Sequence, residues 1–289
     1  MYDAHVMGSE RDGAGGTQAV ERALAALLCF TDAEPKLRVS DVARRVGLTQ
    51  STVSRLLTTL EALGFVERDV RAGAYQLGPT LVTLAGIALN QSEVRRQAVA
   101  ELSEIATTLG LAANLAVLRE DAIFYLATVE GPRAPKAFTM IGKRNPLHCT
   151  GIGKALLAHL PEPDRTAIVE RLSYPRFTPN TIGVPDELLA DLDRIVARGY
   201  ALEREELAFG RACVAAPIRD ASGVVLAALS ISGPLSALDL DRREAELASY
   251  VIEAADRVSH KLGYLTAPAA LVDGSWNGNR GPGRGSTAE

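Results

Sequence analysis

The sequence predicts a two-domain α+β protein with an N-terminal winged helix-turn-helix (helical, with a β wing), a linker helix and a C-terminal α/β domain. Three observations support this prediction. The 289 residues suit two domains of ordinary size. Residues 39–78 are patterned as helix, tight turn, second helix and short hairpin, which is the element order of a winged helix-turn-helix. From residue 93 onward, amphipathic helical segments alternate with apolar strands, which is typical of helices packed on an antiparallel sheet.

The helix-turn-helix is predicted from helix starts, a turn glycine and apolar spacing. Ser40 and Thr49 are hydroxyl residues placed to cap the first and second helices. Gly47 permits the turn between the helices, and Gly64 ends the second one. Each helix has an apolar face at helical spacing, formed by Val42, Ala43 and Val46 in the first and by Val53, Leu56, Leu57, Leu60 and Leu63 in the second.

The opposite face of the second helix predicts contact with DNA. It carries short polar donors and one long cation, namely Gln50, Ser51, Thr52, Ser54 and Arg55. A helix divided in this way can sit in the major groove with its first turns against base edges. Residues 65–78 form the predicted wing, and the cations placed to contact phosphate are Arg44, Arg68 and Arg71. The alternatives are a helical hairpin that only packs and a winged helix that binds protein, but the agreement of caps, turn, polar face and hairpin favours DNA.

The net charge of the N-terminal domain indicates how many copies of the chain are needed to bind one DNA site. The net charge of the whole chain is −4, and residues 17–78 carry eight Lys and Arg against seven Asp and Glu, a net charge of +1. Each neutralised phosphate adds only modestly to affinity, so binding with so few cations requires at least two copies on one site. We therefore expect a homodimer or a dimer of dimers on double-stranded operator DNA.

The segments are expected to be organised as follows. Residues 1–16 and 266–289 are rich in glycine and polar residues, and we predict that both are disordered. Between them we expect the winged helix-turn-helix at 17–78, the linker helix at 79–92 and the C-terminal domain at 93–265. The first helix, over residues 17–30, is predicted to carry Val20, Leu24, Leu27 and Leu28 on one side.

Composition excludes several classes of protein. The chain is 47% hydrophobic and 23% charged, which is ordinary for a soluble globular protein. It has no signal-peptide pattern and no apolar run of membrane-spanning length, so we expect a cytoplasmic protein without a membrane partner. Cys29, Cys149 and Cys213 form no CxxC pair, and the four histidines lack metal-ligand spacing. We therefore predict neither a metal nor a cofactor.

The second domain has features of a small-molecule site. Residues 148–154, HCTGIGK, combine a turn, two glycines and a helix start, and free N–H groups at a helix N-terminus favour an anion such as a carboxylate. Ser230 and Ser232 are two residues apart on one predicted strand and so share a face. Cys213 lies on a neighbouring strand, and Glu203 lies near the end of another. The alternatives are serines that bond only to backbone and a cysteine buried as a core thiol.

Three segments together resemble the IclR family of transcriptional regulators. They are VGLTQSTVSRLLTTLEALGFVERD (46–69) with YQLG closing the wing, PLHCTGIGKALLAHLP (146–161) and CVAAPIRDASGVVLAALSISGP (213–234). The resemblance covers residues 17–263 and implies a winged helix-turn-helix, a linker helix and a C-terminal domain of GAF-like topology. In this family that domain binds a small metabolite and helps to assemble dimers or pairs of dimers.

The resemblance also implies which residues bind the effector. Members that bind small carboxylates use the turn before GK, an acidic residue in the strand before the cysteine, that cysteine and both serines of the SISG strand. Those positions fall on Gly151, Ile152, Glu203, Cys213, Ser230 and Ser232. Glu203 replaces a shorter aspartate, and Arg211 occupies a position that can be apolar in relatives. An inward Arg211 would add a bidentate carboxylate partner, and the alternative is a surface arginine.

We therefore expect a ligand-responsive regulator of a metabolic operon rather than an enzyme. His148 and Cys149 are adjacent, so on an extended segment they point to opposite faces, which is poor geometry for a base and its nucleophile. No catalytic residue is predicted. Two alternatives are a small-molecule enzyme joined to a winged domain and a redox sensor that uses Cys149 or Cys213, which would need an exposed thiolate.

Overall fold

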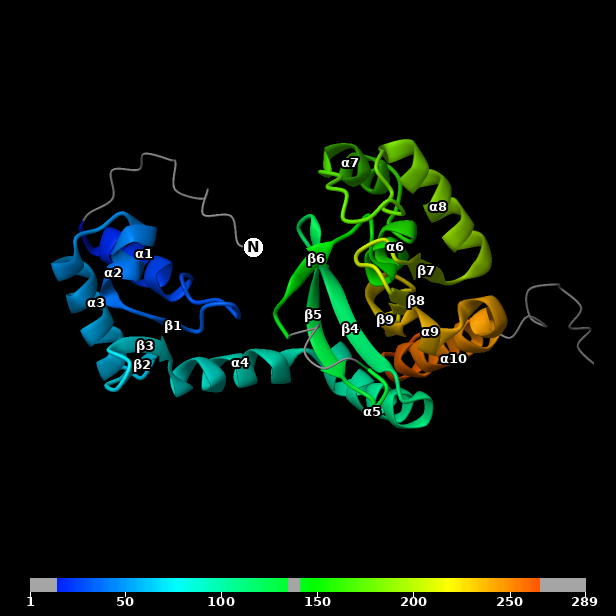
Figure 1. The fold of residues 1–289 in the computed structure, drawn as a ribbon. Coiled ribbons are helices and arrows are strands. Elements are labelled where there is room, and N and C mark those ends of the chain that lie inside the picture. The colour runs from blue at the N-terminus through cyan, green and yellow to red at the C-terminus, as the bar shows by residue number, and fades with distance from the viewer. Residues whose placement is uncertain (1–14, 135–140, 266–289) are drawn as a thin grey trace, which may run out of the picture. The chain divides into compact units, whose positions relative to one another are not determined.

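The computed structural model describes residues 15–134 and 141–265. The chain divides into two compact units, Met1–Gln91 and Ser92–Glu289 (Figure 1). The two segments predicted to be disordered lie outside the described residues, except for Gly15 and Gly16, which begin the first helix. In the described part of the chain, no helix is both long enough and apolar enough to cross a membrane.

The N-terminal unit is a winged helix-turn-helix followed by one further helix. Its helices and strands, in chain order, are α1 (Gly15–Leu27), β1 (Lys36–Leu37), α2 (Val39–Val46), α3 (Gln50–Ala62), β2 (Val66–Asp69), β3 (Ala74–Leu77) and α4 (Pro79–Gln91). The three strands form an antiparallel sheet in the order β1-β3-β2, in which the hairpin β2–β3 is the predicted wing. The short strand β1 was not predicted from the sequence.

One of the two predicted helix caps is confirmed and the other is wrong. Thr49 caps α3, because its Oγ1 accepts the N–H of Thr52 at 3.3 Å. Ser40 does not cap α2, because the helix already begins at Val39. The side chain of Asp41 reaches back instead, and its Oδ2 accepts the N–H of Arg38 at 3.2 Å. Gly47 adopts a left-handed conformation (φ 66°), as a turn glycine requires.

The core of this unit differs from the predicted core at its edges. Val42, Val53 and Leu57 are fully buried as expected, but Leu63 is 60% exposed at the end of α3. The first helix turns Ala26 to the core, with Leu27 packed against it, and leaves the other large apolar residues of the predicted side in solvent. The exposed fractions are 58% for Val20, 55% for Leu24 and 64% for Leu28, while Leu27 is half-buried.

The helix α4 begins at Pro79 as the sequence predicts, since proline suits the first position of a helix. None of its residues is buried within the unit. Its exposed apolar side chains are Val82, Leu84 and Ile87. Residues 80–91, TLVTLAGIALNQ, are apolar enough to predict that this helix needs a partner surface, and this stays a prediction.

The C-terminal unit is built on a six-stranded antiparallel sheet in the order β6-β5-β4-β9-β8-β7. The strands are β4 (Ala112–Arg119), β5 (Ala122–Val129), β6 (Arg144–Pro146), β7 (Ala201–Arg204), β8 (Arg211–Arg219) and β9 (Val225–Pro234). The helices are α5 (Glu93–Leu109), α6 (Gly151–Ala158), α7 (Asp164–Arg171), α8 (Pro185–Arg198), α9 (Leu235–Leu238) and α10 (Leu240–Lys261). Strand β6 and the short helix α9 were not predicted.

Helices cover both faces of this sheet (Figure 1). Because strand side chains alternate between faces, each strand contributes to two cores. On β8, Ala212, Val214 and Ala216 belong to the core beneath α5 and α10, whereas Cys213 and Ala215 belong to the core with α6, α7 and α8. This arrangement confirms the predicted α+β class, and it places the start of α6 directly over the middle of the sheet.

Candidate effector pocket and DNA-binding surface

The start of α6 is fixed by a threonine cap and two glycines. Thr150 Oγ1 accepts the N–H of Gly153 at 3.1 Å and donates to the carbonyl of Pro146 at 2.7 Å. Gly151 and Ile152 occupy the first two helical positions, whose N–H groups have no acceptor within the helix. These N–H groups and the helix dipole make this end partially positive, so it suits an anionic ligand group.

The glycines are required by close packing. A Cβ atom on Gly151 would lie 2.8 Å from the Sγ of Cys213, and a Cβ on Gly153 would lie 2.4 Å from the carbonyl oxygen of Leu147. Both distances are shorter than normal contacts. The glycines thus allow the N-terminal end of α6 to approach the sheet closely.

A buried ion cluster is centred on Lys154 of the same helix. The Nζ of Lys154 lies 2.9 Å from Asp191 Oδ2 and 2.6 Å from Glu206 Oε1, and its side chain is only 2% exposed. Asp191 belongs to α8 and Glu206 follows β7. The cluster therefore ties α6 to two other elements of the unit.

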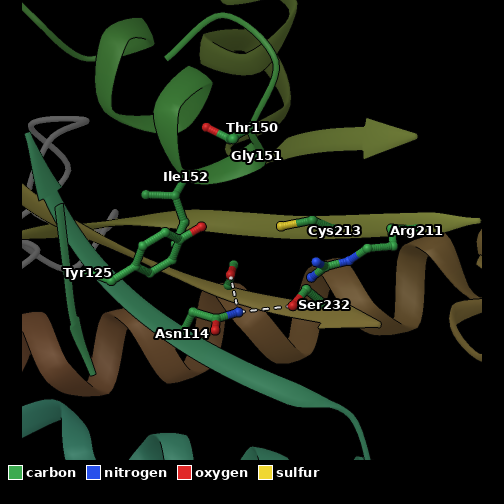
Figure 2. A pocket seen from close by; sticks show the side chains of 9 residues that line it. Asn114, Tyr125, Thr150, Gly151, Ile152, Arg211, Cys213 and Ser232 are labelled. Atoms are coloured by element: carbon green, nitrogen blue, oxygen red, sulfur yellow. Dashed lines mark hydrogen bonds between the residues drawn. The ribbon is translucent and has the colours of Figure 1, made fainter. Parts of the chain in front are cut away.

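The floor of the site is formed by β4, β9 and β8. Asn114 lies opposite Ser230 in the β4–β9 register, and Cys213 lies opposite Ser232 in the β8–β9 register. The Nδ2 of Asn114 donates to Ser230 Oγ at 3.2 Å and to Ser232 Oγ at 2.9 Å (Figure 2). All four residues are at most 8% exposed, so this is a buried polar surface.

A small cavity lies between the start of α6 and this floor. Figure 2 shows Ile152 and Tyr125 on one side of it, Cys213 toward α6, and the guanidinium of Arg211 reaching in from β8. Its lining residues are Asn114, Tyr125, Thr150, Gly151, Ile152, Arg211, Cys213, Ser230 and Ser232. The structure thus brings together five of the six residues proposed for the effector, and Arg211, whose orientation the sequence left open, faces the cavity.

Glu203 is the proposed effector residue that does not line the cavity. Its carboxyl is buried, and Oε1 accepts the N–H groups of Glu206 at 2.7 Å and Leu207 at 3.2 Å. It lies opposite Cys213 in the β7–β8 register. Burial raises the pKa of Glu203 to about 7, against the opposing effect of the two backbone hydrogen bonds. Its position supports a role behind the cavity, in holding the turn after β7.

Three lining residues were missed by the sequence analysis. Thr150 could have been predicted from the sequence, because a threonine directly before a helix start is a common cap. Asn114 could also have been predicted, since it is the only amide side chain in the apolar strand AANLAVLR. Tyr125 could not, because an aromatic residue in a strand is ordinarily a core residue.

Cys149, Cys213 and His148, which lie at or near the site, are buried side chains. Burial raises the pKa values of both Cys149 and Cys213 to about 12, so neither thiol ionises near neutral pH. The ring of His148 packs against Tyr174 and Phe177, and its Nε2 lies 3.2 Å from the carbonyl of Pro175. These contacts are those of a structural histidine, and buried thiols are poor redox sensors.

The residues proposed to contact DNA lie on α3, α2 and the wing of the N-terminal unit. Seven of them are exposed, namely Arg44, Gln50, Ser51, Ser54, Arg55, Arg68 and Arg71. Thr52 is half-buried, and its Oγ1 lies 2.9 Å from that of Thr49. The side chain of Arg44 is 74% exposed and forms an ion pair of 3.1 Å with Asp41. Arg45, a neighbouring exposed cation, is held within the unit, where it donates to the carbonyl of Cys29 at 2.7 Å and to Glu34 at 2.5 Å.

Comparison with known proteins identifies the family. The family model for the IclR helix-turn-helix domain matches residues 19–70, and that for the bacterial transcriptional regulator IclR C-terminal domain matches residues 86–260. The chain belongs to the IclR family of transcriptional regulators. It is 35% identical over 250 residues to the HTH-type transcriptional regulator XynR of Escherichia coli strain K12, with 86% of this chain and 98% of XynR covered.

Solved structures of IclR relatives share the fold. A transcriptional regulator from Rhodococcus sp. RHA1 superposes with a TM-score of 0.78 at 32% identity, covering 85% of this chain and 98% of that one. An IclR homologue from Microbacterium hydrocarbonoxydans, crystallised in complex with 4-hydroxybenzoate, has a TM-score of 0.74 at 26% identity, covering 84% and 98%.

Membership of the IclR family decides between the functional classes that the sequence left open. The chain is a DNA-binding transcriptional regulator and not an enzyme, in agreement with relatives that are named as regulators. The helix-turn-helix is therefore a DNA-binding element rather than a packing hairpin.

Proposed function

We propose that this IclR-family regulator binds an operator of a metabolic operon as a homodimer or dimer of dimers, and that a small carboxylate in the C-terminal unit changes its operator affinity. The observation that carries this proposal is the cavity between α6 and the sheet. The helix N-terminus and Arg211 offer positive charge there, opposite a floor of buried hydroxyl and amide groups.

In this proposal α3 reads the bases and the wing holds the backbone. Exposed polar side chains on the first turns of α3 suit base edges in the major groove, with Arg55 placed to pair with a guanine. Arg44, Arg68 and Arg71 contact phosphate. The remaining proposed base contacts are Gln50, Ser51, Thr52 and Ser54.

The exposed apolar stripe on α1 supports self-association. Val20 and Leu24 of α1 and Leu28, the residue directly after it, are spaced four residues apart, so they lie along one side, and each is more than half exposed. An apolar stripe of this kind is typical of an interaction surface. A second copy of the chain is the natural occupant, because the small positive charge of one winged domain calls for two on a site.

The proposed effector is an organic acid held by groups from three elements. The N–H groups of Gly151 and Ile152 receive its carboxylate, and Cys213, Ser230 and Ser232 form the surface beneath it. Glu203 acts from behind the cavity by fixing the turn after β7. The 4-hydroxybenzoate complex of the Microbacterium homologue supports an acid as ligand. Such an effector changes operator affinity only through a difference in affinity for two protein states, typically about 1–3 kcal/mol.

The experiment is DNase footprinting of the full-length protein on the promoter region flanking its own gene, with non-specific competitor at physiological salt. We expect a discrete protected site with two-fold or repeated symmetry, and this site then serves as the probe for small acids, including 4-hydroxybenzoate. Ser230→Ala is expected to leave operator affinity without acid unchanged and to weaken the response to acid. Absence of a specific site there and in a genome-wide selection would overturn the proposal.

A further inference from the structure

The tip of the wing carries an acidic residue beside the cations proposed to contact phosphate. Asp69 is the last residue of β2 and lies opposite Ala74 of β3 in the hairpin register. The loop between these two residues contains Arg71 and ends at Gly73, which adopts a left-handed conformation (φ 59°). An acid at this position would be expected, from its charge alone, to repel the phosphates of DNA. The contacts of its two carboxylate oxygens indicate a different role.

One carboxylate oxygen of Asp69 holds the loop. Its Oδ1 accepts the backbone N–H of Arg71 at 3.1 Å and that of Ala72 at 3.1 Å. An aspartate that accepts backbone N–H groups two and three residues ahead fixes a turn through its own side chain. The exposed side chain of Arg71 therefore extends from a fixed backbone, and less conformational freedom is lost when it binds a partner.

The other carboxylate oxygen is paired with a lysine. The Nζ of Lys36 on β1 lies 2.7 Å from Asp69 Oδ2. The strand registers place Lys36 and Asp69 on one face of the small sheet and Arg68 on the opposite face, because strand side chains alternate. The hydrogen bonds from Lys36 and from the loop backbone lower the pKa of Asp69, so its carboxyl is ionised at neutral pH. Its negative charge is thus balanced by an ammonium group and directed away from Arg68.

We infer that Asp69, although it is an acid, strengthens the binding of DNA by holding the wing-tip loop so that Arg71 meets a backbone phosphate. The inference rests on the proposed contact between the wing and DNA, and it makes Asp69 a positioning residue that acts through Arg71. If only the charge of Asp69 mattered, every substitution that removes its carboxylate would tighten DNA binding. The geometry predicts the opposite for a substitution that also removes the acceptor of the two N–H groups.

The test compares two variants that lose the same charge. Asp69→Ala removes the charge and the acceptor, whereas Asp69→Asn removes the charge and keeps an oxygen that accepts both N–H groups. Affinity of the full-length protein for duplex DNA is measured by fluorescence anisotropy over a range of salt concentrations. Asp69→Ala is expected to lower the affinity at least about fivefold at about 0.15 M salt and to reduce the salt slope by about 1, since one phosphate contact is lost. Asp69→Asn is expected to bind at least as tightly as the wild type.

Further variants separate positioning from charge and from folding. Glu67→Ala is the matched control, because Glu67 lies on the same strand and face, and its carboxylate accepts the side-chain Nε2 of Gln76 at 3.2 Å. This variant also loses one negative charge and should not weaken binding. In an Arg71→Ala background, Asp69→Ala should cause no further loss of affinity, because the two residues act as one unit. If Asp69→Ala does not fold, Asp69→Glu decides, since it keeps the charge and moves the carboxylate out of the turn, and it should also weaken binding.

Two results would overturn the inference: Asp69→Ala binding as tightly as Asp69→Asn, or an undiminished loss when Arg71 is already alanine. A phosphate contact does not depend on base sequence, so a duplex of random sequence carries the test as well as the operator does. A discrete operator footprint with equal affinities of the two Asp69 variants would leave the proposed function intact and remove the positioning role. A weakened Asp69→Ala on random duplex without any protected operator would do the reverse.

Discussion

At the scale of single residues, the site places positively charged groups close to a buried carboxyl group. Arg211 and the first N–H groups of α6 attract an anion, while the buried carboxyl of Glu203 lies behind Cys213. Glu203 is tolerated there because two backbone N–H groups bond to it and because burial favours its neutral form. Protonation of this carboxyl should therefore change the stability of the fold. Substitution of the cations on the DNA-binding surface should instead change operator affinity.

The free energy of unfolding is expected to depend on pH through Glu203. Its pKa is near 4.5 when exposed and about 7 in the folded chain, so the folded state binds the proton more tightly. The resulting stabilisation is fully present below pH 4.5 and is lost as the pH rises through 7, by roughly 3 kcal/mol. Urea unfolding at pH 5 and pH 8 should show this loss in the wild type and not in Glu203→Gln. The same pH dependence in both proteins would contradict the assignment.

Arg55→Ala is expected to weaken operator binding by about 1–3 kcal/mol and to relax the preference at one base pair, because the guanidinium is placed to pair with a guanine. Fluorescence anisotropy on the footprinted site and on single-base variants measures both effects. Arg171→Ala, an exposed arginine of the C-terminal unit, is the control. Unchanged affinity and preference in Arg55→Ala would mean that α3 docks in another way.

At the scale of elements, α6 is the part of the C-terminal unit on which the site depends. Its N-terminus supplies the N–H groups that we propose to bind an anion, its two glycines let it approach β8, and Lys154 ties it to Asp191 and Glu206. Such a helix has little freedom to shift, since all of its residues are buried. The packing of α6 against β8 can be tested directly.

Gly151→Ala is expected to destabilise the protein by about 1–3 kcal/mol, because the added methyl group would lie 2.8 Å from the Sγ of Cys213. Cys213→Ala removes that sulfur, so the double variant should recover part of the lost stability. Chemical unfolding of the two single variants and the double variant gives the coupling energy. Strictly additive effects would show that the two side chains do not meet.

At the scale of the whole molecule, the chain consists of two compact units that carry different features of the regulator. The N-terminal unit carries the DNA-binding surface, and the C-terminal unit carries the cavity. Apolar side chains are exposed on α1 and on α4 within the first unit. In the proposed homodimer or dimer of dimers, a second copy of the chain would cover this exposed surface.

Leu24→Lys is expected to shift the protein from dimer toward monomer, because a cation on the α1 stripe would be buried against an apolar partner surface. Analytical ultracentrifugation measures the change, and operator affinity should fall with it. Val224→Lys, at an equally exposed valine in the turn before β9, is the matched control. A Leu24→Lys protein that keeps the oligomeric state of the wild type would exclude α1 from the interface.

Local signals in the sequence were sufficient for most elements. Thr49 as a cap, Pro185 and Gly199 at the two ends of α8, and Gly110 after α5 all act through neighbouring backbone groups, so their positions predict helix ends without knowledge of the fold. The same holds for alternating strands such as β8, whose period of two residues assigns each side chain to a face.

The sequence by itself determined the order of most elements and the IclR resemblance. It also indicated that the helix start at Gly151 and the pair Ser230 and Ser232 belong to one site. Only the tertiary structure decided which apolar face of α1 is buried, whether Arg211 turns inward, and that Asn114 joins Ser230 and Ser232 while Glu203 stays behind the cavity. These outcomes depend on contacts between residues up to 118 positions apart, and on competition between surfaces for burial. A local sequence pattern contains neither the long-range contacts nor the competition for burial. Periodicity shows which residues share one face of a helix or strand, but not which other element will cover that face.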